Sequence, residues 1–290
     1  MYPELIRIGH FSISTYGVLV GLAFLAAAAV ARRSLEEKRL PGEEAWNLLV
    51  YAVLGGLAGG KIYYAVLHGD PSSLLSRSGL VWYGGLIGGA IAVFWGIRRK
   101  RLPLGPTADA LAVALPLGHA IGHIGCFFSG DSYGLPSSLP WAVSFPRGAP
   151  PSTAGFLRAE FGVELPAAIP DAALIRVHPT MLYSAAALLL IFALLWHLRR
   201  RPRPAGWLFG IYLVSSGIER FLVEFVRAKD DRFLGGLTTA QAIAAVAIVG
   251  GLALVFHVTR RSASTVPILG AAARRGAGDG SRSPAEGMDR

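Results

Sequence analysis

The chain has 290 residues, of which 53% are apolar and only 16% charged, and its mean hydropathy is positive at +0.48. Its formal charge of +10 is carried by short clusters of lysine and arginine beside long apolar runs, a pattern typical of membrane proteins rather than of nucleic-acid-binding proteins. The composition therefore predicts an all-α integral membrane protein and excludes nucleic acid as the expected partner.

Apolar runs close to the ~20 residues that a helix needs to cross a bilayer recur along the chain. The first run follows a start with only Arg7 for positive charge and is itself followed by Arg32 and Arg33. This order is the reverse of a signal peptide, so we expect the run to remain as a transmembrane helix. The seven expected spans are residues 13–31, 45–67, 80–97, 108–128, 179–198, 206–226 and 238–258.

Basic residues alternate strongly between the loops that join these spans. They are dense after the first, third and fifth spans and sparser for their length in the other connections. Because cytoplasmic loops are enriched in lysine and arginine, we expect an amino terminus outside and a carboxyl terminus in the cytoplasm. The dense clusters are Arg32, Arg33, Lys38 and Arg39; Arg98, Arg99, Lys100 and Arg101; and Arg199, Arg200, Arg201 and Arg203.

Polar side chains concentrate at the end of the fourth span, between Gly118 and Gly134. In a helix, His119 and His123 are one turn apart, and Cys126 follows His123 by three residues. The expected topology places this stretch in the outer half of the span. Any chemistry that it performs should therefore face outward.

The remaining sequence suggests a membrane domain at 1–258, with an extracytoplasmic segment at about 129–177, and a tail at 259–290. The segment is rich in proline and glycine, which predicts a lid or a substrate-docking arm whose Trp141 and Phe145 contact the membrane interface. The tail is small, polar and low in aromatic residues, which predicts a disordered cytoplasmic tail.

Charged residues inside the spans need a partner or a wet cavity, because a charge at that depth costs at least ~2.5 kcal/mol. Lys61 lies in the second span after two glycine pairs, so we expect its side chain to turn inward and the glycines to serve tight helix packing. In the sixth span, Glu224 follows Arg220 by four residues and precedes Arg227 by three. This spacing fits either a structural ion pair or a guanidinium presented to a phosphate. His178 lies on the same outer side.

Three functional interpretations of the stretch in the fourth span remain open beside ordinary core packing. A metal site formed by His119, His123 and Cys126 has plausible ligand types but only a weak signature. A Cys126 nucleophile activated by His123 is chemically reasonable, although a thiol in an apolar stretch is usually inert. A lipid headgroup pocket lined by Ser129, Asp131 and the histidines is favoured by its position at the outer interface.

Several motifs occur in the order that is typical of one family. Each is modest alone, but their order from the first span to about residue 258 argues against coincidence. On these motifs the chain resembles the prolipoprotein diacylglyceryl transferases, bacterial inner-membrane enzymes with seven helices and an outside amino terminus. The motifs are Tyr16-Gly17; Gly59-Gly60-Lys61-Ile62-Tyr63-Tyr64; Gly84-Gly85-Leu86-Ile87-Gly88; Gly122-His123-Ile124-Gly125-Cys126-Phe127 with Gly130 and Gly134; His178-Pro179-Thr180 with Leu182-Tyr183; and Arg220-Phe221, Glu224-Phe225 and Arg227.

The resemblance implies transfer of a diacylglyceryl group from phosphatidylglycerol to the thiol of the lipobox cysteine in a preprolipoprotein, with release of glycerol 1-phosphate. It implies no cofactor and no metal. The expected partners are phosphatidylglycerol, the signal peptide that carries the lipobox, and membrane lipid of the bacterial inner membrane. Such chemistry needs arginines that hold the phosphate and a base that helps to ionise a thiol with a pKa of ~8.5. Arg227 matches the family's essential arginine after Glu-Phe in the sixth span.

The chain departs from the family pattern mainly in the fourth span. A histidine that replaces an arginine is mostly neutral at pH 7 and lacks a fixed bidentate fork. The replaced positions are His123 for the arginine, Cys126 and Ser129 for two asparagines, Asp131 for a glutamate, Tyr83 for the histidine before the Gly-Gly pair, Lys61 for an arginine and Ser184 for a glutamate.

These departures suggest that His123 serves as the base, with Lys61 or Arg227 holding the phosphate. Two alternatives remain: a divergent paralogue that acts on another phospholipid or acceptor, and a non-catalytic lipid-binding protein. The resemblance gives His123, Arg227 and Tyr83 as catalytic candidates, and Lys61, Ser129, Asp131, Gly130, Tyr16, Glu224, Arg220 and His178 as substrate-binding candidates.

Overall fold

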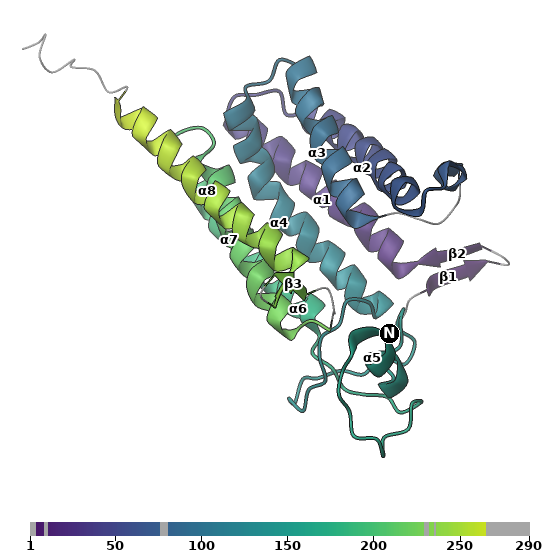
Figure 1. Ribbon diagram of the computed structural model, residues 1–290. Helices are drawn as coiled ribbons and strands as arrows, with labels where there is room; N and C mark the ends of the chain where they lie inside the picture. Colours follow the sequence, from purple (N-terminus) through teal and green to yellow (C-terminus); the bar gives the residue numbers. More distant parts are fainter. Residues whose placement is uncertain (1–3, 9–10, 76–80, 229–231, 235, 265–290) are drawn as a thin grey trace, which may run out of the picture.

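The computed structural model is a bundle of long helices that run side by side, with a folded segment at one end (Figure 1). It describes residues 4–8, 11–75, 81–228, 232–234 and 236–264.

Helices occupy the apolar runs of the sequence, and some extend beyond the boundaries expected from hydropathy. Helix α1 continues to Glu37 instead of residue 31, because Arg32 pairs with Glu36 and Arg33 with Glu37 one turn apart. The long helices are α1 (Thr15–Glu37), α2 (Glu44–His68), α3 (Trp82–Arg99), α4 (Leu104–Ser129), α6 (Thr180–Leu198), α7 (Trp207–Val223) and α8 (Thr239–Ser264).

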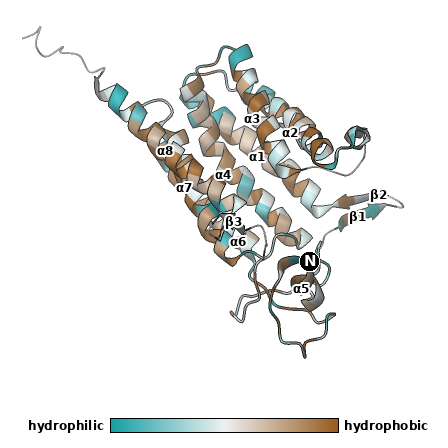
Figure 2. Cartoon of the chain, viewed as in Figure 1, coloured by the Kyte–Doolittle hydropathy of each residue, from teal (hydrophilic) through white to brown (hydrophobic). Residues whose placement is uncertain are grey.

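Within the described residues, five helices are long and apolar enough to cross a membrane: α1, α2, α4, α6 and α8. Helix α7, with 17 residues, and the glycine-rich helix α3, with 18, do not meet these criteria of length and hydropathy. Both nevertheless lie in the same bundle (Figure 1). Large apolar side chains such as Leu57, Leu190 and Val246 are exposed along the helices, and hydrophobic residues prevail along their length (Figure 2). The chain is therefore a mostly helical, multi-pass membrane protein.

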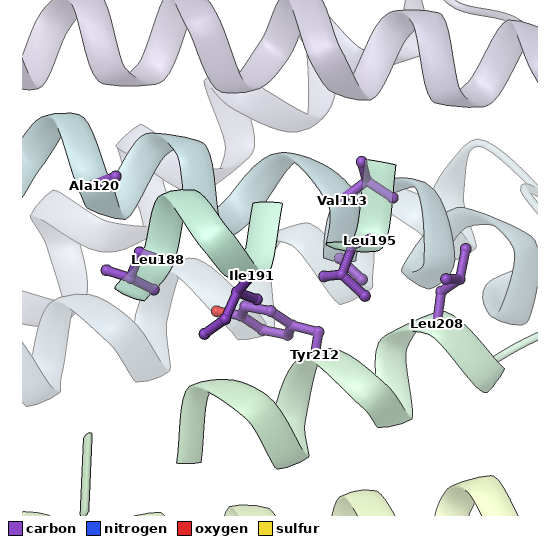
Figure 3. Packing of buried hydrophobic residues seen from close by; sticks show 8 residues of the cluster. Val113, Ala120, Leu188, Ile191, Leu195, Leu208 and Tyr212 are labelled. Carbon is purple, nitrogen blue, oxygen red and sulfur yellow. The ribbon is translucent and has the colours of Figure 1, made fainter. Parts of the chain in front are cut away.

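Helix α4 lies at the centre of the bundle. It packs against α1 on one side and against α6 and α7 on the other, while α8 covers α7 and the α2–α3 pair adjoins α1 (Figure 1). The core between α4, α6 and α7 contains Val113, Ala120, Leu188, Leu195 and Tyr212 (Figure 3). Polar residues of α4 can consequently meet residues from three other helices.

The glycines of α2 and α3 allow the two backbones to approach closely. A Cβ atom on Gly59 would collide with the Gly84 carbonyl oxygen, and one on Gly88 would collide with the Gly55 carbonyl oxygen. The predicted role of these glycines in helix packing is thereby confirmed.

The two ends of the bundle carry different connections. The three basic clusters lie near the ends of α1 and α3 and in the loops after α1, α3 and α6, and these loops share one end of the bundle, here called the basic end (Figure 1). The other end, here called the α5 end, carries two small antiparallel sheets, β1–β2 and β3–β4, and the segment after α4. The short elements are β1 (Glu4–Ile8), β2 (Phe11–Ser14), η1 (Pro71–Leu75), α5 (Ala154–Phe161), η2 (Glu224–Val226), β3 (Arg232–Leu234) and β4 (Leu237–Thr238).

The segment between α4 and α6 has a hydrophobic core of its own. Phe145, Leu157 and Val177 are fully buried in it and pack with Tyr133 and Met181. The prediction that Phe145 contacts the membrane interface is therefore wrong: its ring packs against the Tyr133 ring, with centroids 5.4 Å apart.

Helix α8 continues past the boundary that the sequence placed at residue 258. Most of the predicted disordered tail, residues 265–290, lies outside the described residues.

Candidate functional site

The polar side chains at the end of α4 are placed by the way in which this helix stops. Gly130 adopts a left-handed conformation with φ 69°, and its N–H donates to the Cys126 and Phe127 carbonyl oxygens. The N–H of Asp131 also donates to the Cys126 carbonyl, at 3.2 Å. The chain thus folds back at once, and the Asp131 carboxylate interacts electrostatically with the Cys126 thiol.

Gly134 joins this turn to two distant elements. Its N–H donates to the His178 carbonyl at 2.8 Å, and the N–H of Leu135 donates to the Val226 carbonyl at 2.9 Å. A Cβ atom on Gly134 would collide with the Val226 oxygen and lie 2.7 Å from Thr180 Cγ2, so only glycine fits. This crossing fixes the end of α4, the start of α6 and the residue after η2 relative to one another.

Arg227, the residue after η2, shares the carboxylate of Glu224 with Arg220. Arg220 Nη2 lies 2.8 Å and Arg227 Nη1 3.8 Å from Oε2 of Glu224, whose side chain is fully buried. The predicted ion pairs are confirmed. Each guanidinium has five N–H donors, so one shared carboxylate leaves most of them free for another anion. The side chains of Arg220 and Arg227 are 32% and 20% exposed.

His123 faces these arginines from α4. Its ring interacts electrostatically with His119, Arg220 and Arg227, and its Nδ1 atom is buried without a hydrogen-bond partner among the described residues. Arg227 also interacts with Cys126. The structure therefore brings together two histidines, a thiol and two guanidiniums from α4 and the end of α7.

One face of α4 beside His123 is uncovered. A Cβ atom on Gly122 would meet no atom within 4 Å, and His119 is exposed although α4 lies at the centre of the bundle. Gly125, one turn further on, is covered by Tyr16, whose Cδ2 would lie 3.2 Å from an added Cβ. Tyr16 in turn interacts with the Cys126 and Asp131 side chains. The open side of Gly122 thus leaves space beside His123 for a bound molecule, and Tyr16 borders this space at Gly125.

His178 is held by a relay of hydrogen bonds that sequence analysis missed. Trp141 Nε1 donates to the Tyr183 hydroxyl at 2.8 Å, and this hydroxyl lies 3.2 Å from His178 Nδ1. The Tyr183 hydroxyl thus links Trp141 to His178 and holds the orientation of the imidazole ring. The Leu-Tyr motif after His178 was the available signal, but nothing in the sequence tied it to Trp141.

Glu219 is a second residue that sequence analysis did not assign. This half-buried side chain interacts with Ser184 of α6 and with Arg220 and Arg227, while its Oε1 atom is buried and has no hydrogen-bond partner among the described residues.

The other predicted residues lie at different distances from this cluster. Ser129 ends α4 and its carbonyl accepts the N–H of Ala149 at 3.2 Å. Lys61 and Tyr83 belong to the α2–α3 pair, on the opposite side of α1 and α4 from α7 (Figure 1). Within the described part of the chain, the electrostatic partners of His123 and Arg227 come from α4, α7, Glu224 and the segment after α4.

A metal ion gains no support from this arrangement. No group of three or more histidine, cysteine, aspartate or glutamate side chains in the described ranges has the geometry of a metal site. The His119, His123 and Cys126 set remains a weak signature.

Comparisons with known proteins all give the same family name. The sequence model of one family, described as prolipoprotein diacylglyceryl transferase, matches residues 3–257. A protein of Bordetella avium (strain 197N) is 32% identical over 277 residues, covering 90% of this chain and 96% of its own length. Proteins of Vibrio vulnificus (strain YJ016) and Clostridium tetani (strain Massachusetts / E88) are 31% and 29% identical, covering 89% and 90% of this chain and 92% and 98% of their own lengths. All three are named phosphatidylglycerol–prolipoprotein diacylglyceryl transferase. The chain belongs to the prolipoprotein diacylglyceryl transferase family.

Proposed function

We propose that this protein is a transferase that moves a diacylglyceryl group from phosphatidylglycerol to a cysteine thiol of a prolipoprotein, the first step of bacterial lipoprotein maturation. The names of its relatives support this activity. The observation that carries it in this chain is the pair of guanidiniums, Arg220 and Arg227, that share one buried carboxylate and keep free donors beside His123.

The reaction replaces a phosphate-ester C–O bond by a C–S bond. The acceptor thiolate attacks the glyceryl carbon that carries the phosphate oxygen, and glycerol 1-phosphate leaves with the electron pair of the C–O bond. Negative charge grows on the departing phosphate, where donors held in place stabilise it most. Arg220 and Arg227 are positioned for this role because Glu224 fixes both of them.

The acceptor thiol must lose its proton before it attacks. His123 is the proposed base: its buried Nδ1 has no hydrogen-bond partner in the described part of the chain, so this atom is available to accept the proton of the acceptor thiol. Cys126 is an unsuitable nucleophile, because it is half-buried among the apolar side chains at the end of α4, where a thiol is usually inert. The remaining polar residues, Tyr16, Ser129, Gly130, Asp131 and His178, would line the headgroup site.

Lys61 and Tyr83 stay predictions from the sequence. Their helices lie apart from α7, and the contacts that support the proposal do not involve them.

The proposed arrangement in the membrane has seven spans, α1 to α4 and α6 to α8, with the amino terminus outside and the carboxyl terminus in the cytoplasm of a bacterium. The positive-inside rule supports it, since the basic clusters lie near the ends of α1 and α3 and in the connections after α1, α3 and α6, which share one end of the bundle. Residues 1–258 would then form the membrane domain of an inner-membrane protein. The segment at 129–177 would lie on the extracytoplasmic side, next to the site that receives the lipobox of the signal peptide.

The decisive experiment measures transfer of radiolabelled glyceride from phosphatidylglycerol to a synthetic lipobox peptide by the purified protein. Transfer should be abolished by Arg220→Gln and by Arg227→Gln and retained by Cys126→Ser. Wild-type protein that binds phosphatidylglycerol but transfers nothing would refute the proposal in favour of a lipid-binding protein or of another acceptor.

A further pair of variants separates two roles of His123. If it is the base, both His123→Gln and His123→Arg should lose transfer by ~100-fold or more, the usual contribution of a general base. If it instead only contacts the phosphate, His123→Arg, which adds a bidentate donor, should retain or raise the rate. Full activity of His123→Gln would exclude both roles.

A further inference from the structure

A cavity lies at the basic end of the bundle, far along α4 from the His123 cluster. Its volume is about 380 Å³, within the range of small-ligand sites. It lies between the ends of α1 and α6 and the first half of α4. Its lining residues are Ser34, Glu37, Lys38, Val113, Arg199 and Arg200.

One wall of this cavity is a rigid ion pair. The Arg199 side chain is only 4% exposed, and its Nε and Nη2 atoms donate to the two oxygens of Glu37 at 2.8 and 3.1 Å. Its guanidinium also stacks on the Trp196 ring, 3.2 Å from the centroid, and donates to the Trp196 carbonyl. Glu37, which is the one acidic residue in the lining, is therefore already neutralised by a bidentate partner.

The remaining polar groups of the lining are donors. Lys38 Nζ lies 3.8 Å from Asp109, whose two oxygens are occupied by the N–H groups of Gly206 and Phe209, both at 2.9 Å. The Ser34 hydroxyl is buried and has no hydrogen-bond partner among the described residues. An unsatisfied buried hydroxyl is destabilising, and a bound acceptor would satisfy it.

Arg200 is the third basic residue that lines the cavity, and it lies at the solvent-exposed edge. Its Nε lies 3.6 Å from Glu37 Oε1, beyond hydrogen-bond distance, and its side chain is 65% exposed. Three basic side chains thus surround one neutralised carboxylate, and the excess positive charge, with the unpartnered Ser34 hydroxyl, selects an anion with several acceptor oxygens.

We propose that this cavity binds a phosphate group, as a second site separate from the transfer site. Ser34, Lys38 and Arg200 would donate to the phosphate oxygens, and the Arg199–Glu37 pair would form one wall of the cavity. Because the cavity lies where α1 and α6 end, it is at the depth of lipid headgroups, and basic pockets between membrane helices commonly hold anionic headgroups. The same chemistry would accept free phosphate, and the experiment must separate these two sources.

Binding is best measured by equilibrium dialysis against two radiolabelled probes, short-chain dihexanoylphosphatidylglycerol and inorganic phosphate. The protein carries Arg220→Gln throughout, which weakens binding at the proposed transfer site. Adding Arg200→Gln or Lys38→Gln should weaken the remaining site roughly tenfold or more, as loss of one charge-assisted hydrogen bond predicts. The matched control is Arg201→Gln, which removes the same charge one residue away, where Arg201 bonds to His197 and does not line the cavity.

The pattern across the two probes identifies the source of the phosphate. Arg200-sensitive binding of the lipid probe alone assigns a lipid headgroup, and Arg200-sensitive binding of both probes assigns a free phosphate. The proposal is overturned if Arg200→Gln and Lys38→Gln bind both probes as Arg201→Gln does. Arg200 is mostly exposed, so its substitution should leave the thermal unfolding midpoint unchanged and keep the comparison valid.

Discussion

The crossing at Gly134 can be tested by adding a single methyl group. In Gly134→Ala the new Cβ would collide with the Val226 carbonyl oxygen and lie 2.7 Å from Thr180 Cγ2 and 2.8 Å from His178 Cβ. Two of these neighbours are near the backbone and cannot turn away as a long side chain would. Overpacking of this kind costs ~1–3 kcal/mol, and separation of the strands would also weaken two backbone hydrogen bonds worth ~1 kcal/mol each.

The expected loss of stability is therefore roughly 2–4 kcal/mol, read as a lower thermal unfolding midpoint of the detergent-solubilised protein. The rate of lipobox-peptide transfer should fall further, by ~100-fold, because a 1 Å shift of Arg227 misplaces its guanidinium. Gly250→Ala is the matched control: an added Cβ there meets no atom within 4 Å, so a helical alanine should be neutral or stabilise by up to ~1 kcal/mol. A Gly134→Ala protein with wild-type stability and rate would show that the crossing does not position Arg227.

Three other substitutions test the remaining contacts. Glu224→Gln leaves two guanidiniums without their shared charge, so stability should fall by ~3 kcal/mol or more with loss of transfer, whereas Glu160→Gln on the exposed surface of α5 should change neither. Asp109→Ala removes both acceptors at the start of α7 and should lower stability by ~1–2 kcal/mol, and an unchanged unfolding midpoint would refute this capping role. Burial raises the pKa of Tyr133 to about 12 in the folded protein, against ~10 when unfolded, so its contribution to stability is complete below pH ~10 and is lost as the pH rises towards 12. Tyr133→Phe should flatten this decline in alkaline unfolding curves, and identical curves would contradict it.

Hydropathy predicted the positions of the helices better than their ends. It shows where an apolar run stops, but a helix can continue beyond that point. Helix α1 does so and reaches Glu37 through charged pairs that follow its apolar run. The spacing of Arg220, Glu224 and Arg227 sufficed to predict their pairing, because such contacts within one helical turn depend only on local geometry.

Contacts between distant parts of the chain were beyond sequence reasoning. Phe145 has the composition of an interfacial aromatic, and only the folding of its segment over Leu157 and Val177 buries it. Gly134 looked like one glycine among many, since the requirement for it comes from Val226, which is remote in sequence. The Trp141–Tyr183 hydrogen bond was hidden for the same reason.

The register between α4 and α7 decides whether His123 meets the arginines, and each end of α7 is fixed by a group from elsewhere. At its start, the Asp109 carboxylate of α4 accepts the N–H groups of Gly206 and Phe209. Beyond its end, the strand through Gly134 bonds to the residues on either side of Arg227. A polar cluster such as this one adds little net stability, because desolvation offsets the attraction between its charges. The cluster therefore cannot hold the two helices in register by itself, and the anchors at both ends of α7 do so instead.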